Sequence, residues 1–257
     1  MKTPLIVEFD NPVGVVDSRV AVLVPVSPNI RREYVNSCLY LAQRAVLPFR
    51  HYIIALDPRG APPPKGKPHP YRQSALAKIR QDMVDCYLGD SDWVFWVDAD
   101  IVDYKSTLLL DLVSRADGGI AAPVVLMDGE LGQGPAYEDG FGWGKFFDVG
   151  GFVENGRWAR FEQPWFDQPG PVFELESVGG CYVVRSDLYR QGAKYAPDYK
   201  SLEFIATGAL WEPGIVGRNQ MNSANCFTEH YSVCQWARSH GYPVRAFADL
   251  VVRHAKI

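Results

Sequence analysis

Short apolar runs alternate along the chain with longer stretches in which apolar residues recur every three or four positions. Residues 20–26 are apolar and mostly β-branched, which is typical of a strand buried on both faces. Similar runs predict strands over residues 51–57, 93–100 and 119–127. The stretches after the first three of these strands are long enough for a helix each.

Those longer stretches carry apolar stripes at helical spacing, and residues 27–29 supply capping chemistry for the first. The three stripes comprise Val35, Cys38, Leu39, Ala42 and Val46, then Leu76, Ile79, Met83, Val84 and Tyr87, then Leu108, Leu109 and Leu112. Alternating strands and helices predict an α/β fold with a mainly parallel central sheet, whose ligands bind beyond the carboxyl ends of the strands. We therefore expect functional residues directly after Val26, Asp57 and Asp98.

The rest of the chain is less regular. Residues 57–73 hold six prolines and no apolar period, so we interpret them as an exposed loop. Residues 128–170 are rich in glycine and aromatic residues, which predicts a hairpin-rich subdomain that shapes a pocket. Later elements are predicted as a strand, a turn and a helix over 174–192, a helix over 228–240 closed by Gly241, and a last strand over 243–254. Without repeats or a linker, residues 1–257 are predicted to form one domain.

Composition narrows the functional classes. The net charge of -4 provides no basic field for nucleic acid or a membrane surface. The five cysteines form no CxxC pair and sit mostly in apolar segments, so we interpret them as reduced core thiols. The first residues contain no continuous apolar leader, and no apolar run approaches the ~20 residues of a membrane span. We therefore expect a cytoplasmic protein without a membrane span.

The strongest chemical signal is the pair of carboxylates Asp98 and Asp100, which follow the apolar run WVFWV. Side chains two positions apart in an extended chain point the same way, and aligned carboxylates repel each other unless a cation lies between them. Carboxylate oxygens suit Mg²⁺ or Mn²⁺ bound to phosphate. The alternative is that Asp98 caps the next helix while Asp100 is solvated. Their place at the end of a strand favours the metal site.

Four further residues have both a structural and a functional interpretation. His254 follows a β-branched run and is either an exposed tail residue or a metal ligand. Glu229 lies at the start of the last helix, where it either complements the helix dipole or serves a site. Arg80 on a helix and Asp57 after a strand are either surface ions or contacts to a charged substrate.

Taken together, the segments resemble a known family. The chain is similar to the GT-A nucleotide-sugar glycosyltransferases in the order of PVSPN, Asp57, KIRQ, WVFWVDADI, ESVGGCYVVRSDLYRQGAKYAPDY, TEHYSVCQWARSHGYPV and VVRH. Within that fold it most resembles the fungal α-mannosyltransferase family that supplies subunits of the Golgi mannan polymerase. The resemblance covers roughly residues 20–254. It implies a Rossmann-like GT-A domain, with a nucleotide-sugar-binding half over 20–126 and an acceptor-side half over 127–257.

The resemblance also implies which residues contact the donor, a GDP- or UDP-sugar. Pro25, Val26 and Ser27 would flank the nucleotide. Asp57 would bind the base or the ribose, and Arg80 would meet the diphosphate or the sugar. Apart from Arg80, which lies on a predicted helix, these positions lie at the strand ends where the fold predicts ligands.

Metal and sugar contacts follow from the same resemblance. Asp100 and His254 would hold Mn²⁺ or Mg²⁺, with Asp98 as a metal ligand or as a contact to the ribose or the sugar. A divalent metal would stabilise the negative charge on the departing nucleoside diphosphate. Gly179 and Gly180 would let the backbone approach the sugar and acceptor closely, although a simple turn also explains them.

The resemblance leaves the stereochemistry open. The mannosyltransferase family retains anomeric configuration and carries a Glu-Thr-Glu run, matched here by Phe227, Thr228 and Glu229. In that case Glu229 would orient the sugar or the acceptor. The large inverting families of the same fold have an acidic pair at this place, and an inverting enzyme would use Glu229 or His230 as its general base.

The predicted function is therefore a metal-dependent hexosyltransferase that moves a sugar from a nucleotide sugar to a hydroxyl acceptor. The acceptor could be a glycan, a lipid-linked sugar or a hydroxylated DNA base. The negative net charge argues mildly against DNA, although Arg59, Lys65, Lys67 and Arg72 could form a local basic patch. Alternatives are a nucleotidyltransferase-like phosphate-metal enzyme and a non-catalytic carbohydrate-binding module that uses the aromatic residues of 141–166. The sequence does not predict the oligomeric state.

Overall fold

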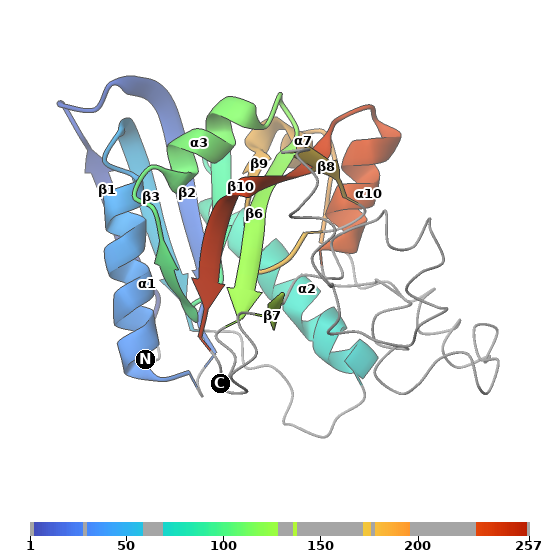
Figure 1. Ribbon diagram of the computed structural model, residues 1–257, viewed down its shortest axis with the longest axis horizontal. Coiled ribbons are helices and arrows are strands. Elements are labelled where there is room, and N and C mark those ends of the chain that lie inside the picture. Colours follow the sequence, from blue (N-terminus) through green and yellow to red (C-terminus); the bar gives the residue numbers. More distant parts are fainter. Residues whose placement is uncertain are drawn as a thin grey trace.

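The computed structural model describes residues 3–27, 30–58, 69–127, 136–137, 172–175, 178–195 and 230–255. In this part of the chain, ten strands form one sheet in the order β1-β3-β2-β4-β9-β6-β10-β5, with β7 on β6 and β8 on β10 (Figure 1). The strands are β1 (Leu5–Asp10), β2 (Val16–Pro25), β3 (Phe49–Asp57), β4 (Trp93–Val97), β5 (Ile101–Tyr104), β6 (Ile120–Met127), β7 (Ala136–Tyr137), β8 (Val172–Glu174), β9 (Cys181–Arg185) and β10 (Val244–His254). The helices are α1 (Arg32–Ala45), α2 (His69–Tyr87), α3 (Leu108–Arg115), α7 (Ser186–Arg190) and α10 (Tyr231–Ser239).

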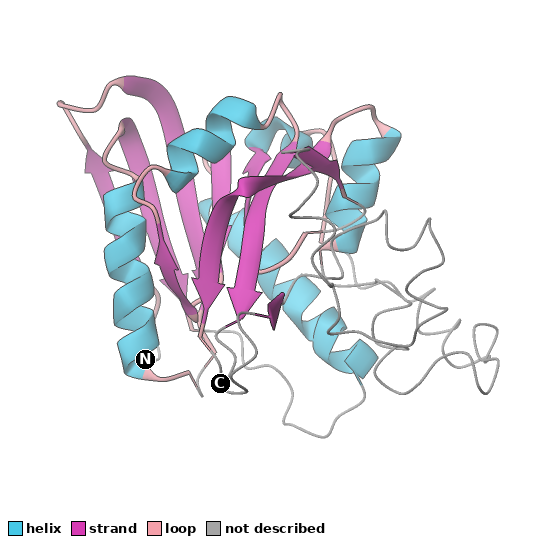
Figure 2. Cartoon of the chain, viewed as in Figure 1, coloured by secondary structure: helices cyan, strands magenta, loops and turns pink. Residues whose placement is uncertain are grey.

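Helices cover both faces of the sheet (Figure 2). On one face, Val20, Val22 and Val24 of β2 pack in a core with α1 and α3. On the other face, Ala21 and Leu23 join a core with α2, α7 and α10. The alternation along β2 shows why its sequence is apolar at every position, because each face of a central strand is buried. The α/β fold predicted from the sequence is confirmed.

The sheet is mixed, where the sequence predicted a mainly parallel one. β2 is parallel to β3 and β4, and β6 is parallel to β10. β9 lies between β4 and β6 and is antiparallel to both, so β4 and β6 also share one direction. Since β2, β3, β4, β6 and β10 all run the same way, their carboxyl ends lie along one edge of the sheet. Val26 and Ser27 follow β2, Asp98 and Asp100 follow β4, and Asp57 and His254 are the last residues of β3 and β10.

Three other predictions are refined by the structure. The helix α2 begins at His69, inside the stretch predicted as a loop, and a proline as its second residue is compatible with the first turn of a helix. Gly241 ends α10 with a φ of 80°, in the left-handed region that glycine adopts at low cost. Cys38, Cys181 and Cys234 are buried free thiols, as predicted, but Cys86 is exposed on α2.

Among the helices of the described ranges, none is both long and apolar enough to span a membrane.

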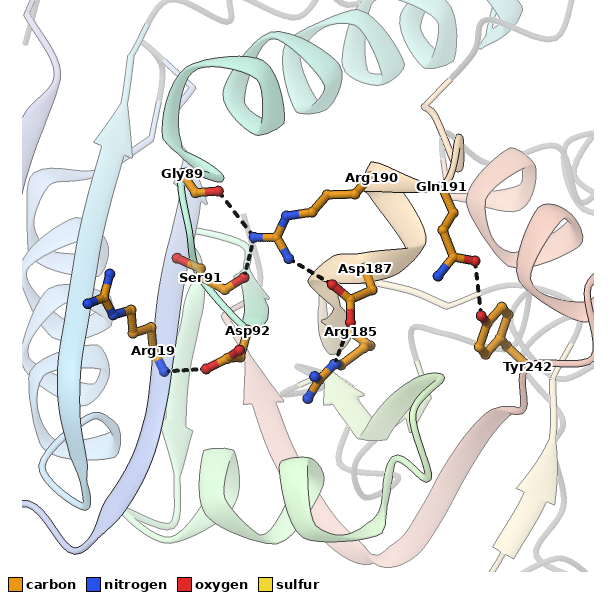
Figure 3. A network of polar contacts seen from close by, with 9 residues as sticks. All are labelled: Arg19, Gly89, Ser91, Asp92, Arg185, Asp187, Arg190, Gln191 and Tyr242. Atoms are coloured by element: carbon orange, nitrogen blue, oxygen red, sulfur yellow. Dashed lines mark hydrogen bonds and ion pairs between the residues drawn. The ribbon is translucent and has the colours of Figure 1, made fainter.

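At the edge of the sheet opposite the predicted site, a network of hydrogen bonds joins α7 to the segment before β4 (Figure 3). Arg190 of α7 donates to the carbonyl oxygens of Gly89 and Ser91, which precede β4, at 3.1 and 2.8 Å. The same guanidinium donates to Asp187 at 2.9 Å, and Arg185 donates to the other oxygen of that carboxylate at 3.3 Å. This network fixes α7 against the start of β4.

Asp187→Asn is expected to destabilise the protein at neutral pH but not in acid. Hydrogen bonding from Arg190 holds the pKa of Asp187 below its ordinary value, against the opposing effect of burial. A carboxyl group with a lowered pKa contributes stability above its ordinary pKa, and this contribution is lost as the pH falls through the lowered value. The pair is largely exposed, so we expect a loss below about 1 kcal/mol. Urea unfolding at pH 7 and pH 3 measures it, and an equal loss at both values would contradict the charge argument.

Candidate functional site

The carboxyl ends of β2 and β3 bring the predicted nucleotide contacts together. Pro25 lies beside Asp57 in the parallel register, and the backbone N–H of Val26 donates to the carbonyl oxygen of Asp57 at 2.9 Å. Ser27 follows directly along the chain. The Asp57 side chain is 2% exposed, and its Oδ2 accepts a hydrogen bond from the Tyr87 hydroxyl of α2 at 3.0 Å. The Tyr87 bond orients this buried carboxylate at the end of β3.

Asp98 follows β4 on the same edge and is paired with Arg80 of α2. The guanidinium Nη2 donates to Asp98 Oδ1 at 2.7 Å, and its carbon lies 5.0 Å from the centre of the Trp96 ring. The Arg80 side chain is 2% exposed, whereas that of Asp98 is 31% exposed. A buried cation therefore holds one oxygen of a carboxylate that solvent still reaches.

Gly180 lies against Asp98 from the start of β9. Its carbonyl oxygen accepts from the backbone N–H of Asp98 at 2.7 Å. A Cβ atom at this position would lie 3.0 Å from Asp98 Oδ2, closer than side chains normally pack. Gly180 allows close approach to Asp98, and Gly179 precedes it, partly buried. This explains the glycine pair by contact within the protein, in addition to any contact with a substrate.

Asp100 is paired with His254, from the far end of the chain. Asp100 Oδ1 lies 3.0 Å from His254 Nε2, and both side chains are mostly buried. The two segments are also joined by their backbones, since the N–H of Ala255 donates to the carbonyl oxygen of Asp100 at 2.8 Å. His254 Nδ1 lies 2.7 Å from the carbonyl oxygen of Ala255, an acceptor only, so Nδ1 carries a proton. In neutral His254, the lone pair on Nε2 is then directed at Asp100.

This pair fits a divalent cation in its chemistry. An imidazole that donates through one nitrogen to a carbonyl oxygen and presents the other nitrogen is the usual form of a histidine ligand. Adjacent ligands in an octahedral site, each about 2.1 Å from the metal, lie about 3 Å apart. Asp100 Oδ1 and His254 Nε2 have this separation. Within the described residues no cluster of three such side chains is present.

Cys38 of α1 lies close to Asp98 and Asp100. Its Sγ is 3.8 Å from the carbonyl oxygen of Asp98 and is fully buried. Burial raises the pKa of the Cys38 thiol, and the charges of Asp100 and Asp98 raise it further. Cys38 is therefore a neutral thiol at physiological pH, and this excludes it as a nucleophile for the site.

Of the two residues predicted to act at the start of the last helix, His230 lies within the described part of the chain. Glu229 lies outside the described residues. His230 immediately precedes α10 and is buried, and its Nδ1 lies 3.0 Å from the Tyr182 hydroxyl of β9. The aromatic residues of 141–166 also lie outside the described ranges. Tyr87, Trp96 and Tyr182 were missed as site residues, because no motif or spacing distinguishes them from ordinary core aromatics.

Comparison with known proteins gives matches among solved structures. No protein-family model matches the chain. The crystal structure of GalNAc-T7 with UDP, GalNAc and Mn²⁺ aligns with 93% of this chain at 10% identity and a TM-score of 0.44. This chain spans 43% of that structure's length. A mycobacterial protein aligns over 93% of this chain and 68% of its own, at 10% identity and a TM-score of 0.37.

A third match is a glycosyltransferase involved in the glycosylation of the major capsid of the virus PBCV-1. It aligns with 58% of this chain and 71% of its own, at 15% identity and a TM-score of 0.27. Two of these three structural neighbours are thus glycosyltransferases, one of them crystallised with a nucleotide, a sugar and a manganese ion. At these identities and scores, the comparisons assign no activity to this chain.

Proposed function

We propose that the protein is a metal-dependent glycosyltransferase that transfers a sugar from a nucleotide sugar to a hydroxyl acceptor. One observation carries this proposal. At a single edge of the sheet, Asp100 and His254 are paired at 3.0 Å, beside the Arg80–Asp98 pair and the buried Asp57. The arrangement combines a pair suited to a cation, a fixed positive charge and carboxylate acceptors, which match the diphosphate and the hydroxyl groups of a nucleotide sugar.

Each group has a role in the proposed reaction. Asp57, Pro25, Val26 and Ser27 bind the base and ribose of the donor. Asp100 and His254 would hold a divalent metal, which would supply positive charge to the diphosphate leaving group. This electrostatic stabilisation needs no proton transfer to the leaving group.

The Arg80–Asp98 pair serves the sugar side of the donor. The buried guanidinium fixes one oxygen of Asp98, and the carboxylate remains accessible enough to accept hydrogen bonds from hydroxyl groups. Gly180 keeps the backbone close to this carboxylate without a side chain in the way. Glu229 orients the sugar or the acceptor in a retaining reaction, or acts as the general base in an inverting one.

The donor class is a UDP- or GDP-hexose, in line with the resemblance to the mannosyltransferase family. The acceptor is a glycan, a lipid-linked sugar or a hydroxylated DNA base. A nucleotidyltransferase would use the same aligned carboxylates, but it would release pyrophosphate and not a nucleoside diphosphate. A carbohydrate-binding module would bind glycans equally well with or without metal and nucleotide.

A thermal-shift screen tests the proposal directly. We expect UDP or GDP to raise the melting temperature only when Mn²⁺ or Mg²⁺ is present, because a ligand at a hundred times its Kd adds about 2.7 kcal/mol of stability. Slow hydrolysis of the matching nucleotide sugar should then release the nucleoside diphosphate. Glycan binding that ignores metal and nucleotide, or release of pyrophosphate, would replace this proposal by one of the two alternatives.

A further inference from the structure

A chain of buried polar contacts runs behind the site, from the sheet to the start of α10. The Trp96 indole Nε1 donates to the Tyr189 hydroxyl at 3.0 Å, and this hydroxyl lies 2.7 Å from that of Tyr195. The Tyr195 hydroxyl lies 2.6 Å from that of Tyr182, which lies 3.0 Å from His230 Nδ1. All five side chains are buried. The chain therefore links β4, α7, β9 and the beginning of α10.

With the partners that the described residues provide, this hydrogen-bond chain has one direction in which every hydroxyl proton has an acceptor. Burial raises the pKa of Tyr182, Tyr189 and Tyr195, so each hydroxyl carries one proton at neutral pH. An indole N–H only donates, so the Tyr189 oxygen accepts from Trp96 and must pass its own proton to Tyr195. Tyr195 then donates to Tyr182, and Tyr182 donates to His230 Nδ1.

The reverse direction of donation leaves a proton without an acceptor at the Trp96 end of the hydrogen-bond chain. If His230 Nδ1 carried a proton and donated to Tyr182, the hydroxyl groups would donate toward Tyr189. The Tyr189 proton would then have no acceptor among the described residues, since both neighbours of its oxygen, the Trp96 indole and the Tyr195 hydroxyl, would donate to it. A buried hydroxyl proton without an acceptor is costly, and a doubly protonated His230 would cause the same defect.

We propose that this hydrogen-bond chain fixes His230 as the neutral tautomer with its proton on Nε2, which makes it a hydrogen-bond donor and not the general base. The assignment of His230 to the reaction rests on the proposed function. Tyr182, Tyr189 and Tyr195 are then positioning residues, because they act on the site through His230. The general base of an inverting reaction would have to be Glu229 or another group.

Ring contacts connect His230 with the donor-side pair of Arg80 and Asp98. Tyr182 of β9 is paired with Trp96 of β4 in the strand register. The Arg80 guanidinium lies over the Trp96 ring and donates to Asp98. The His230 ring packs edge-on against Tyr182, with centroids 5.1 Å apart and an interplanar angle of 80°. Contacts through two aromatic rings thus connect His230 with Arg80.

Nitrogen NMR of the ¹⁵N-labelled full-length protein tests the tautomer without any assay of activity. Two-bond nitrogen–proton correlations distinguish a nitrogen with a proton from one without, and the loss of one set of signals in His230→Asn identifies the residue among five histidines. We expect Nδ1 without a proton and Nε2 with one at pH 7. A proton on Nδ1 in the wild-type protein would overturn the proposal, whatever reaction the protein catalyses.

Two variants distinguish a role of the hydrogen-bond chain in positioning His230 from a role in core packing alone. Tyr182→Phe should give His230 a mixture of the two tautomers, and it should lower kcat on the order of tenfold with an unchanged KM for the donor. Tyr104→Phe is the matched control, because Tyr104 is a buried tyrosine of β5 whose hydroxyl has no hydrogen-bond partner among the described residues. It should change neither the tautomer nor kcat. A Tyr182→Phe protein with the wild-type tautomer and kcat would show that the chain only stabilises the fold.

Discussion

Asp100→Ala is expected to abolish metal-dependent nucleotide binding and sugar transfer while leaving the fold intact. Asp100 and His254 are the pair whose chemistry and 3.0 Å separation fit a divalent cation. Loss of a group that merely orients a metal ligand typically lowers affinity or activity about 10- to 100-fold. Removal of the ligand itself should lower turnover by more than 10²-fold, on the order of the loss of a group that stabilises transition-state charge.

A nearby carboxylate provides the control for this experiment. Asp103 lies on β5, three residues beyond Asp100, and forms a mostly exposed ion pair with Arg253 at 3.8 Å. Asp103→Ala should therefore keep both nucleotide binding and turnover. Isothermal titration of UDP and GDP with and without Mn²⁺ measures the metal-dependent nucleotide binding of both variants. If Asp100→Ala bound nucleotide and metal as the wild type does, the cation site would have to lie elsewhere.

The central strands could be predicted because they are buried on both faces. Every position of 20–24 in β2 is apolar, and its alternate residues enter two separate cores. The edge strands β1 and β5 were also missed, and for β1 the reason is the opposite one. In β1 most side chains are exposed, and Glu8 and Asp10 interrupt the apolar pattern, so only pairing with β3 defines it as a strand. Local pattern cannot predict a strand that depends on its neighbour.

The direction of β9 shows a second limit of sequence patterns. The run CYVVR is fully apolar apart from its last residue, as a central strand of either direction would be. Its antiparallel placement between β4 and β6 follows from packing among strands far apart in the sequence. The mixed sheet could therefore not be derived from the alternation of strands and helices.

The candidate site was predictable in part. The pattern of an apolar strand followed by Asp98 and Asp100 predicted that both carboxylates lie where β4 ends, and the structure has them there. It could not show that they have different partners, because Arg80 comes from α2 and His254 from the end of β10. The tyrosine chain was not predictable, since buried tyrosines look like any other core aromatic until their hydroxyl groups meet.

Asp98→Ala is expected to reduce both stability and donor binding, and a second substitution should restore only the first. Arg80 is 2% exposed, and the change removes the carboxylate that balances its charge. Removal of one partner from a buried ion pair costs about 3 to 5 kcal/mol, and the partial exposure of this pair places the loss near the lower limit. Urea unfolding measures the loss as a shift in midpoint with an unchanged slope.

Arg80→Met in the Asp98→Ala background should recover most of that stability. Methionine keeps an unbranched apolar side chain near the Trp96 ring and removes the buried charge, and replacing both partners of a buried pair by apolar groups is often neutral. The double variant should still fail to bind the nucleotide sugar, because both groups proposed to contact its sugar side are gone. Stability losses that simply add in the double variant would show that Arg80 and Asp98 are not energetically coupled. Recovery of donor binding along with stability would remove the pair from the proposed site and leave it a role in the fold alone.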